Sequence, residues 1–469
     1  MPEIPDDESW AVTEWADADL GDARRTQRLV ELATVLAQRP SASLPEACGS
    51  RAQLKAAYRF FDNDANDPHA ILASHVEATT ARLAAVPRVL AVQDTTELDW
   101  TAHPATTGLG PLAHPDHHGL HVHTTLALTP ERVPVGLLAQ HVWAREPDTV
   151  GKRATRKRRP ITAKESQKWL TSVEAVMAAQ AQCPHTHFVC VGDREADVYD
   201  LFLQERPSGV DLLVRASWNR RVDHPERYLW DKVAAPPVVA TLTVRVPRRE
   251  AQPARQATVT VRWSLVLLCP PTHRRAEKLP TLALWAVLAR EDHPPAGVEP
   301  IEWLLLTTCA VHTTEDAVAR VDWYACRWGS EVWHKVLKSG CRLEARQLET
   351  ADRLRRCLAV YSVIAWRILY ATLLSRAMPE APCTMLLEPE EWQALYCTIH
   401  LTATPPATPP PLRQAVHWLG RLGGFLARRG DGEPGVTVLW KGFQHLTDLT
   451  LMYRIMCPAP TKRKDVGKA

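Results

Sequence analysis

The sequence has little that would mark a secreted, redox-active or zinc-binding protein. Its eleven cysteines are an odd number, and no two of them stand in a C-x-x-C pair. Pairs at that spacing are typical of structural zinc sites and of thiol–disulfide motifs. We therefore expect reduced thiols and a cytoplasmic protein.

The sequence also lacks the marks of a membrane or exported protein. We find no run of about 18 apolar residues, the length that a helix needs to cross a bilayer. The first ten residues, MPEIPDDESW, are acidic, whereas a signal peptide begins with basic and then apolar residues. The chain of 469 residues is 45% apolar, enough for a folded protein of two to four domains. We expect no membrane partner.

An excess of charge of one sign is missing as well. The chain has 56 basic and 53 acidic side chains, which leaves a net charge of +3. The basic residues are unevenly distributed, however: residues 152–159, KRATRKRR, hold six of them, and the tail TKRKDVGK is also basic. Such clusters indicate local contact with a polyanion, although a solvated basic loop explains either cluster equally well.

The N-terminal region, residues 1–75, is predicted to be helical. Asp22 is a plausible N-cap for a helix that begins at Ala23. Apolar residues at helical spacing form a core face: Leu29, Leu32, Ala33 and Leu36. Arg24, Arg25 and Arg28 lie together on another face. This pattern predicts either a DNA-binding region that contacts the phosphate backbone or a plain helical bundle. A second helix is predicted around residues 50–64, with Leu54, Tyr58 and Phe61 inward.

Residues 76–400 are predicted to form an α/β domain, in which a strand-rich insertion covers about 212–310. Continuous apolar runs that end at Asp94 and at Gly192-Asp193 indicate buried strands, and ligands tend to bind at strand ends. The segment between the runs predicts two or three further strands. Helices are expected from about 314 to 376. The Pro-rich linker 402–413 precedes a small helical unit, within a C-terminal region at 401–469.

The segment YACRWGSEVWHKVLKSG, residues 324–340, contains one acid among aromatic and basic side chains. On a single helix Tyr324, Arg327, Glu331 and Lys338 form one stripe, because residues turn about 100° each. His334 and Lys335 flank this stripe. Cys326, Trp333 and Leu337 lie on the opposite side, where a core is expected. An ordinary amphipathic helix with a charged face is the alternative.

Three carboxylates, Asp94, Asp193 and Glu331, form the hard-oxygen ligand set that Mg²⁺ prefers. Two such ions activate water and stabilise the leaving oxygen in phosphoryl transfer. Other acids compete for these roles, namely Glu97, Asp99, Glu195 and Asp197. We prefer Asp94 and Asp193 because each ends an apolar run. The histidines between 114 and 123 are interpreted mainly as loop residues, although His123, at the start of a strand, could approach the site.

Several segments resemble bacterial insertion-sequence DDE transposases of the cut-and-paste, hairpin-forming type. The motif Y-x2-R-x3-E-x6-K is met by Tyr324, Arg327, Glu331 and Lys338. VQDTTELDW and VGDREADVYD are similar to the strands that carry the first two acids of that family. LGDARRTQRLVELA and AAYRFFDN resemble its N-terminal DNA-binding region, and LGRLGGFLARRGDGEPGVTVLWKG resembles its C-terminal end. Just before the third acid, relatives often have an aliphatic residue where this chain has Ser330.

The resemblance implies an RNase H-like core with a β insertion, flanked by helical N- and C-terminal domains. Asp94, Asp193 and Glu331 would be the catalytic residues and would hold two Mg²⁺ ions, or Mn²⁺ in their place. The resemblance also implies that the protein binds double-stranded DNA, both inverted repeats and target. It would act as a homodimer on that DNA, in the bacterial cytoplasm at the nucleoid.

The expected DNA contacts extend beyond the motif. Trp303 matches a tryptophan that packs with a flipped base in hairpin-forming relatives, with a strand residue of the core as the alternative. Arg215, Arg220 and Arg221 would line the DNA path, or form a basic turn. His334, Lys335, Arg24, Arg25 and Arg28 complete the predicted DNA-binding set. Two other functions remain open: an RNase H-like nuclease without strand transfer, and an inactive DNA-binding regulator derived from a transposase.

Overall fold

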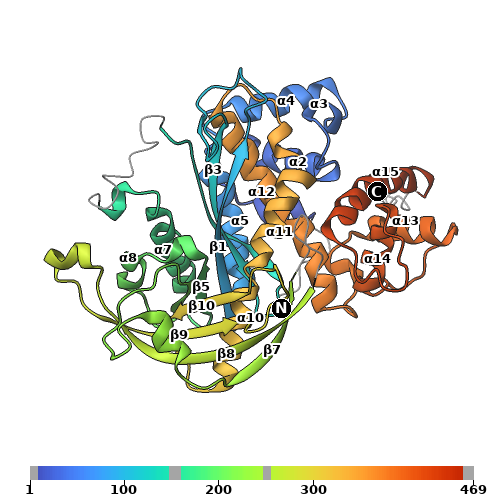
Figure 1. Ribbon diagram of the computed structural model, residues 1–469. Coiled ribbons are helices and arrows are strands. Elements are labelled where there is room, and N and C mark those ends of the chain that lie inside the picture. The colour runs from blue at the N-terminus through green and yellow to red at the C-terminus, as the bar shows by residue number, and fades with distance from the viewer. Residues whose placement is uncertain (1–8, 147–159, 247–254, 458–469) are drawn as a thin grey trace, which may run out of the picture. The chain divides into compact units, whose positions relative to one another are not determined.

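The computed structural model describes residues 9–146, 160–246 and 255–457 (Figure 1). The chain divides into two compact units, which are described separately below: residues 76–331 form the first, and residues 2–75 with 332–469 form the second. The chain is mixed α/β, with a large mixed sheet in the first unit and helices in the N- and C-terminal regions. The basic segment 152–159 and the basic tail lie outside the described residues.

The described part of the first unit is organised on a ten-stranded sheet. The strand order is β2-β3-β1-β5-β6-β10-β9-β8-β7, and β4 pairs with β3. The strands are β1 (Arg88–Asp99), β2 (Gly110–Pro111), β3 (His118–Leu128), β4 (Pro134–Trp143), β5 (His187–Gly192), β6 (Val210–Arg215), β7 (Ala240–Val246), β8 (Arg255–Leu268), β9 (Leu282–Arg290) and β10 (Glu302–Thr307).

Strands β1, β5 and β6 are parallel neighbours, whereas β3 is antiparallel to β1 and β4 is antiparallel to β3. The apolar runs that predicted β1 and β5 are continuous because both faces of these strands are buried. Helix α7 (Gln167–Gln182) covers one face, where Trp169, Val173 and Val176 join the core around β5 (Figure 1). Because β5 is held in register between β1 and β6, the point along the sheet at which the chain leaves β5 is fixed.

The strand-rich segment continues the same sheet. β10 pairs antiparallel with β6, and β9, β8 and β7 follow in order. The predicted start of the insertion at residue 212 falls inside β6, which belongs to the parallel set. The segment also contains a short helix, α9 (Leu229–Ala234), which the alternating pattern did not predict.

The second unit is helical among its described residues. The α-helices that lie wholly within it are α1 (Trp10–Trp15), α2 (Ala23–Gln38), α3 (Leu44–Ala47), α4 (Arg51–Asp62), α12 (Ala351–Ala377), α13 (Pro389–His400), α14 (Leu412–Leu422) and α15 (Val436–Met456), and α5 (Pro68–Leu83) begins in it. The predicted start of α2 is confirmed, since the Asp22 side chain accepts a hydrogen bond from the Arg24 N–H. The predicted inward position of Phe61 is also confirmed. The predicted inward position of Tyr58 is wrong, because its side chain is exposed.

Helix α12 is the long core element of the second unit and contacts α2, α4, α14 and α15. A buried arginine links it to the N-terminal helices: Arg356 donates to the backbone carbonyls of Phe61 and Asn66. By length and composition α12 is apolar enough to cross a membrane, whereas we expected no run of that kind from the sequence. However, 89% of its most apolar window is buried inside the structure, as in the core helix of a globular protein.

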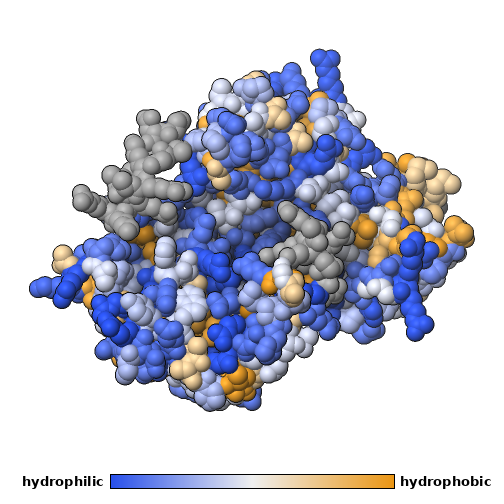
Figure 2. Space-filling model, in the orientation of Figure 1, coloured by the Kyte–Doolittle hydropathy of each residue, from blue (hydrophilic) through white to orange (hydrophobic). Residues whose placement is uncertain are grey.

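The C-terminal helix α15 exposes apolar side chains near its end. Leu451, Met452, Ile455 and Met456 are each more than half exposed. Figure 2 shows hydrophobic surface over the C-terminal helices of this unit. Contiguous exposed apolar surface of this kind is typical of a protein–protein contact.

Candidate active site

The first two predicted acids lie at the same level of adjacent parallel strands. The register of β1 against β5 pairs Val92 with Val191, an offset of 191 − 92 = 99 residues. The offset between Asp94 and Asp193 is also 193 − 94 = 99. Both aspartates therefore stand two residues beyond this last parallel pair. Because alternate residues point to the same face of a sheet, both side chains leave on the same side.

Asp94 lies inside a strand rather than at its end. β1 continues to Asp99 and stays paired with β3, where Asp94 lies opposite Thr124. The sequence placed the end of the strand at Asp94 because the apolar run stops there. β1 in fact continues, and its residues become polar once it passes the end of its parallel neighbour β5. Asp193, by contrast, follows β5 directly, and its Oδ1 accepts a hydrogen bond of 2.8 Å from the Glu195 N–H.

The same face of the sheet continues to Arg215 and Trp303. Val191 pairs with Leu213, two residues before Arg215, and Leu305 pairs with Arg215 in the antiparallel register of β10. Trp303, two residues from Leu305, therefore shares the face. The sheet thus brings two predicted DNA contacts to the face that carries the aspartates.

The motif that contains Glu331 is not one helix, contrary to the prediction. Helix α10 (Thr314–Ala325) begins with a capping box at Thr313 and ends before Cys326. Helix α11 (Trp328–Lys335) carries Glu331 in its first turn, and a π-helical turn, Val336–Gly340, follows. π-helical turns of this kind often occur at functional sites. The predicted buried face survives the break, since Cys326, Trp333 and Leu337 are all buried.

Arg327, in the turn between these helices, joins two of the three acids. Its Nη1 lies 3.1 Å from Asp94 Oδ2, and its Nη2 donates to Glu331 Oε1. A second link comes from Ser330, whose Oγ is 2.9 Å from Asp94 Oδ2. The first and third predicted acids therefore meet in the first unit, held by one guanidinium and one hydroxyl.

Asp94 and Asp193 lie in a partly buried place. Burial raises the pKa of Asp94 above its usual value, against the opposing effects of Arg327 and Ser330. Burial also raises the pKa of Asp193, and the nearby charges of Asp94 and Glu195 raise it further. Such a cluster of buried like charges favours a bound cation, and hard carboxylate oxygens suit a divalent ion such as Mg²⁺. Asp94, Asp193 and Glu331 therefore offer ligand atoms of the kind that a divalent ion takes.

An aromatic and cationic group borders the acids. The rings of Trp303 and Tyr324 meet edge to face, with centroids 5.2 Å apart. Arg215 lies beside Tyr324 and donates a hydrogen bond of 2.7 Å to the Glu302 carbonyl. Burial raises the pKa of the Tyr324 hydroxyl, so it stays protonated and able to donate a hydrogen bond near neutral pH.

Arg220 has a partner that the sequence did not reveal. Its guanidinium donates to Asp197 Oδ1, with Nη2 at 2.6 Å, and the Asp197 side chain is fully buried. Asp197 Oδ2 also accepts from the backbone N–H groups of Ser217 and Trp218. Asp197 and Arg220 therefore shape the loop after β6. Arg221 is exposed on this loop, and Trp218 is 64% exposed.

The competing acids have other partners. Glu97 accepts from the Ala113 N–H, and Asp99 caps a turn at Thr101. Glu195 lies 3.2 Å from the ammonium of Lys168, a side chain that is only 7% exposed. Lys168 lies over the rings of Trp143 and Trp169. The Glu195–Lys168 pair was not predicted from the sequence. The position of Glu195, two residues after Asp193, was the only sign in the sequence that Glu195 lies near the candidate site.

His123 does not face the acids. Its Nδ1 is 2.9 Å from Thr95 Oγ1, and its ring packs edge to face on Trp169. Thr95 follows Asp94 in the strand and so points to the opposite face, which α7 covers. His123 is therefore a core residue of that face and does not approach the site, which the sequence had left open.

The remaining motif residues belong to the second unit. His334 is buried and Lys335 is exposed on α11, while Lys338 lies in the π-helical turn, 3.8 Å from Glu344. Gly340 ends this turn against Trp440, where an added Cβ would come within 2.8 Å of the ring. Close packing thus fixes the turn that carries Lys338.

The three N-terminal arginines lie on α2 but differ in their surroundings. Arg24 is 89% exposed and pairs with Asp22, and Arg28 pairs with Glu31 at 2.7 Å. Arg25 instead donates a hydrogen bond of 2.6 Å to the Leu20 carbonyl. Arg24 and Arg28 therefore present charge to solvent, whereas Arg25 also ties the helix to the preceding loop.

Two protein-family models match segments near the two ends of the chain. A family model described as "Transposase DNA-binding" matches residues 7–66. A second, described as "Transposase Tn5 dimerisation domain", matches residues 363–454. The acidic cluster lies between the two matches. Together with the mixed α/β architecture, these matches support a DNA transposase of the Tn5 type, which binds DNA and forms a homodimer.

Proposed function

We propose that the protein is a DDE transposase that binds terminal inverted repeats, cleaves DNA at the ends of its element and joins the 3′ ends to target DNA. The observation that carries the proposal is the placement of Asp94 relative to the other two predicted acids. Asp94 and Asp193 stand level on parallel strands, and Arg327 links Asp94 to Glu331. The two family matches at the ends of the chain favour a transposase over other enzymes with a carboxylate cluster.

The catalytic domain in this proposal is RNase H-like. Its support is the strand order β4-β3-β1-β5-β6, in which β3 is antiparallel to β1 and β4 to β3, while β5 and β6 run parallel to β1. Strands β7 to β10 would be the insertion between the second and third acids. The helical ends would bind DNA and form the dimer.

Asp94, Asp193 and Glu331 would hold two Mg²⁺ ions, or Mn²⁺ in their place. When bound, such ions activate the attacking water or 3′-hydroxyl and stabilise the leaving oxygen. Arg327 then has a second role. Its guanidinium now lies between two carboxylates, and we propose that it turns to a DNA phosphate when cations occupy the acids, since guanidinium pairs equally well with phosphate.

The groups around the acids would hold the DNA strand. Tyr324 would donate its hydroxyl to a phosphate, and Arg215 and Arg221 would supply positive charge along the path. Trp303 would stack on a base near the cut, a contact worth about 1–3 kcal/mol. Its half-buried ring is already oriented by the edge-to-face contact with Tyr324. His334, Lys335 and Lys338, which belong to the second unit, would also contact DNA.

Two DNA ends must be joined in one reaction, which calls for two copies of the chain. The exposed apolar end of α15 is the proposed contact, and its residues Leu451 and Met452 lie within the region matched by the dimerisation family, which ends at residue 454. The protein would act at the nucleoid in the bacterial cytoplasm.

A supercoiled plasmid that carries the element's ends tests the function. We expect Mg²⁺-dependent excision and joining, abolished by Asp94→Ala, Asp193→Ala and Glu331→Ala. Cleavage without joining would favour an RNase H-like nuclease instead. Binding of the ends without any cleavage by the wild-type protein would favour an inactive regulator.

A further inference from the structure

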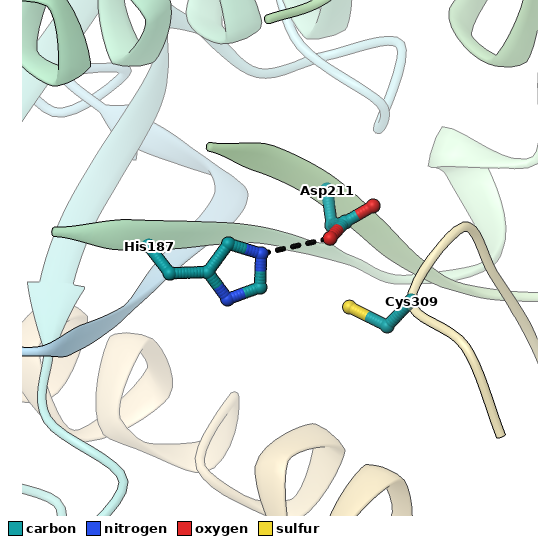
Figure 3. Close-up of side chains that lie close together, drawn as sticks. All are labelled: His187, Asp211 and Cys309. Carbon is teal, nitrogen blue, oxygen red and sulfur yellow. Dashed lines mark hydrogen bonds and ion pairs between the residues drawn. The ribbon is translucent and has the colours of Figure 1, made fainter. Parts of the chain in front are cut away.

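A second group of ligand-type side chains lies at the other end of the parallel strands. His187 is the first residue of β5, Asp211 is the second residue of β6, and Cys309 follows β10 (Figure 3). Asp193 leaves β5 at its opposite end, so this group is separate from the acidic cluster. One potential ligand atom from each of the three residues lies within 4.8 Å of the others.

We propose that His187, Asp211 and Cys309 form a zinc site that fastens the end of the strand-rich insertion to the parallel core. Imidazole nitrogen, carboxylate oxygen and thiolate sulfur are the ligands that Zn²⁺ takes in proteins, usually in a tetrahedral arrangement. The mixture contains soft donors and so differs from the all-oxygen cluster that suits Mg²⁺. This inference does not depend on the proposed function.

The three side chains are already held in place. His187 Nε2 lies 2.8 Å from Asp211 Oδ2, and Thr308 donates to the other carboxylate oxygen. The Thr308 hydroxyl also accepts from the Leu212 N–H at 2.9 Å, and the Cys309 N–H donates to Thr307 Oγ1 at 3.1 Å. Secondary contacts of this kind orient metal ligands and are a regular part of such sites.

The surroundings leave a place for a fourth ligand. The thiol of Cys309 is buried, whereas the side chains of His187 and Asp211 are 29% and 23% exposed. A water molecule could therefore complete the tetrahedron from the solvent side. Arg88 Nε lies 3.5 Å from His187 Nδ1, and this exposed arginine must turn away when Nδ1 carries the proton that a zinc-bound imidazole requires.

The charges are consistent with uptake of one divalent ion. Burial would raise the pKa of Asp211, but hydrogen bonds from His187 and Thr308 bring it below its usual value, so the carboxylate is ionised. Burial raises the pKa of Cys309 to about 12, so its thiol is neutral without metal. On binding, the sulfur–hydrogen bond breaks, the zinc–sulfur bond forms, and one proton leaves to solvent with no change of oxidation state.

Such a site would connect three segments far apart in the sequence. It would join β5 and β6 to the chain just after β10, where the insertion returns to the core. Helix α10 begins five residues later, at Thr314, and leads to Tyr324 and Arg327. A fixed connection here would steady the element that carries the motif.

Co²⁺ is the probe that tests this site, because cobalt bound by a thiolate absorbs in the near ultraviolet and tetrahedral cobalt absorbs strongly in the visible. The titration uses the reduced full-length Asp94→Ala protein, in which the acidic cluster is disabled. We expect one equivalent of Co²⁺ to give both absorptions, and Zn²⁺ to displace it. Absence of a thiolate–cobalt absorption would overturn the proposal and leave a metal-free hydrogen-bonded network.

Two variants locate the site. Cys309→Ser in the same background should lose the thiolate absorption, whereas Cys397→Ser, at a half-buried cysteine on α13, should keep it. Persistence of the absorption in Cys309→Ser would also overturn the proposal. If Cys309→Ser does not fold, Asp211→Asn replaces it, since its amide oxygen still accepts the Thr308 hydrogen bond. Zn²⁺ should then raise the unfolding temperature of the Asp94→Ala protein but not that of the protein that carries both Asp94→Ala and Asp211→Asn.

Discussion

The hydroxyl of Ser330 donates a hydrogen bond of 2.9 Å to Asp94 Oδ2, across 236 positions of sequence. Ser330 is 3% exposed and precedes Glu331, so one residue connects the strand of the first acid to the helix of the third. From the sequence, this serine was a departure from the aliphatic residue that relatives often have. In the structure it is a polar contact that places two of the proposed metal ligands.

Ser330→Ala should weaken metal binding without unfolding the protein. A hydrogen bond to a charged group contributes about 1.5–3 kcal/mol, so its loss should raise the half-saturating Mg²⁺ concentration about tenfold or more. The measurement is Mg²⁺ binding by calorimetry, together with the Mg²⁺ dependence of plasmid cleavage. Ser208→Ala, at an exposed turn of the same unit, is the control. Equal Mg²⁺ affinity in the Ser330→Ala and wild-type proteins would contradict the contact's role.

Asp193→Asn should stabilise the metal-free protein at neutral pH. The pKa of Asp193 is raised by burial and by neighbouring acids, so folding is favoured while it is protonated. That contribution is complete below the unfolded carboxyl pKa of about 3.9 and is lost as the pH rises through the raised folded-state value. The variant cannot ionise and avoids this loss.

Thermal unfolding between pH 4 and 8 in a chelator checks the sign. Asp193→Asn should exceed the wild type most at pH 7 to 8, and the gap should narrow toward pH 4. Added Mg²⁺ should raise the unfolding temperature of the wild type alone. A variant that is less stable than the wild type at pH 7 would contradict the assigned repulsion.

Gly192→Ala should disturb the site from the end of β5. A Cβ at Gly192 would lie 2.5 Å from Ala196 Cβ and 3.4 Å from the Trp169 ring, so the turn that holds Asp193 must shift. Overpacking of this kind costs about 1–3 kcal/mol. We expect a lower unfolding temperature and loss of cleavage, measured together. Gly49→Ala, where an added Cβ meets only the end of the Gln53 side chain at 3.7 Å, should change neither property.

The sequence predicted elements with a strong local signal and missed contacts that only the fold creates. Asp22 and the apolar repeat were sufficient to place α2, because caps and periodicity act over a few residues. The break between α10 and α11 was invisible, since the charged stripe of 324–338 is compatible with one regular helix. The long-range partner of Ser330 has no local signature at all.

The candidate site, like the fold, was predicted only in part. Asp94 and Asp193 are 99 residues apart in the sequence, and paired residues of β1 and β5 are also 99 apart. The sequence contains the first of these numbers, but only the structure supplies the second. Arg220 illustrates the opposite case. It was grouped with the DNA contacts because it is basic, yet it is bound to a buried acid that lies 23 residues earlier.

Asp197→Ala should therefore act on folding rather than on metal binding. The Asp197 side chain is fully buried and bound to Arg220, and removal of one partner of a buried ion pair costs about 3–5 kcal/mol. Denaturant unfolding should show this loss, while Mg²⁺ affinity changes little. Asp200→Ala, on the short helix α8 (Tyr199–Leu203) that follows, breaks a more exposed pair with Arg274 and should cost about 1 kcal/mol or less. Similar losses in the two variants would contradict the anchoring role of Asp197.

Arg24→Ala and Arg28→Ala should weaken DNA binding through charge alone. Both side chains reach solvent on α2, within the region matched by the DNA-binding family. Removal of one cation from a DNA phosphate should reduce the slope of log affinity against log salt by about 0.9. Fluorescence anisotropy with an end-sequence duplex at several salt concentrations measures the slope. Arg25→Ala should in addition lower the unfolding temperature, because Arg25 bonds the Leu20 carbonyl. Unchanged slopes in both Arg24→Ala and Arg28→Ala would move the DNA contact to another face of this region.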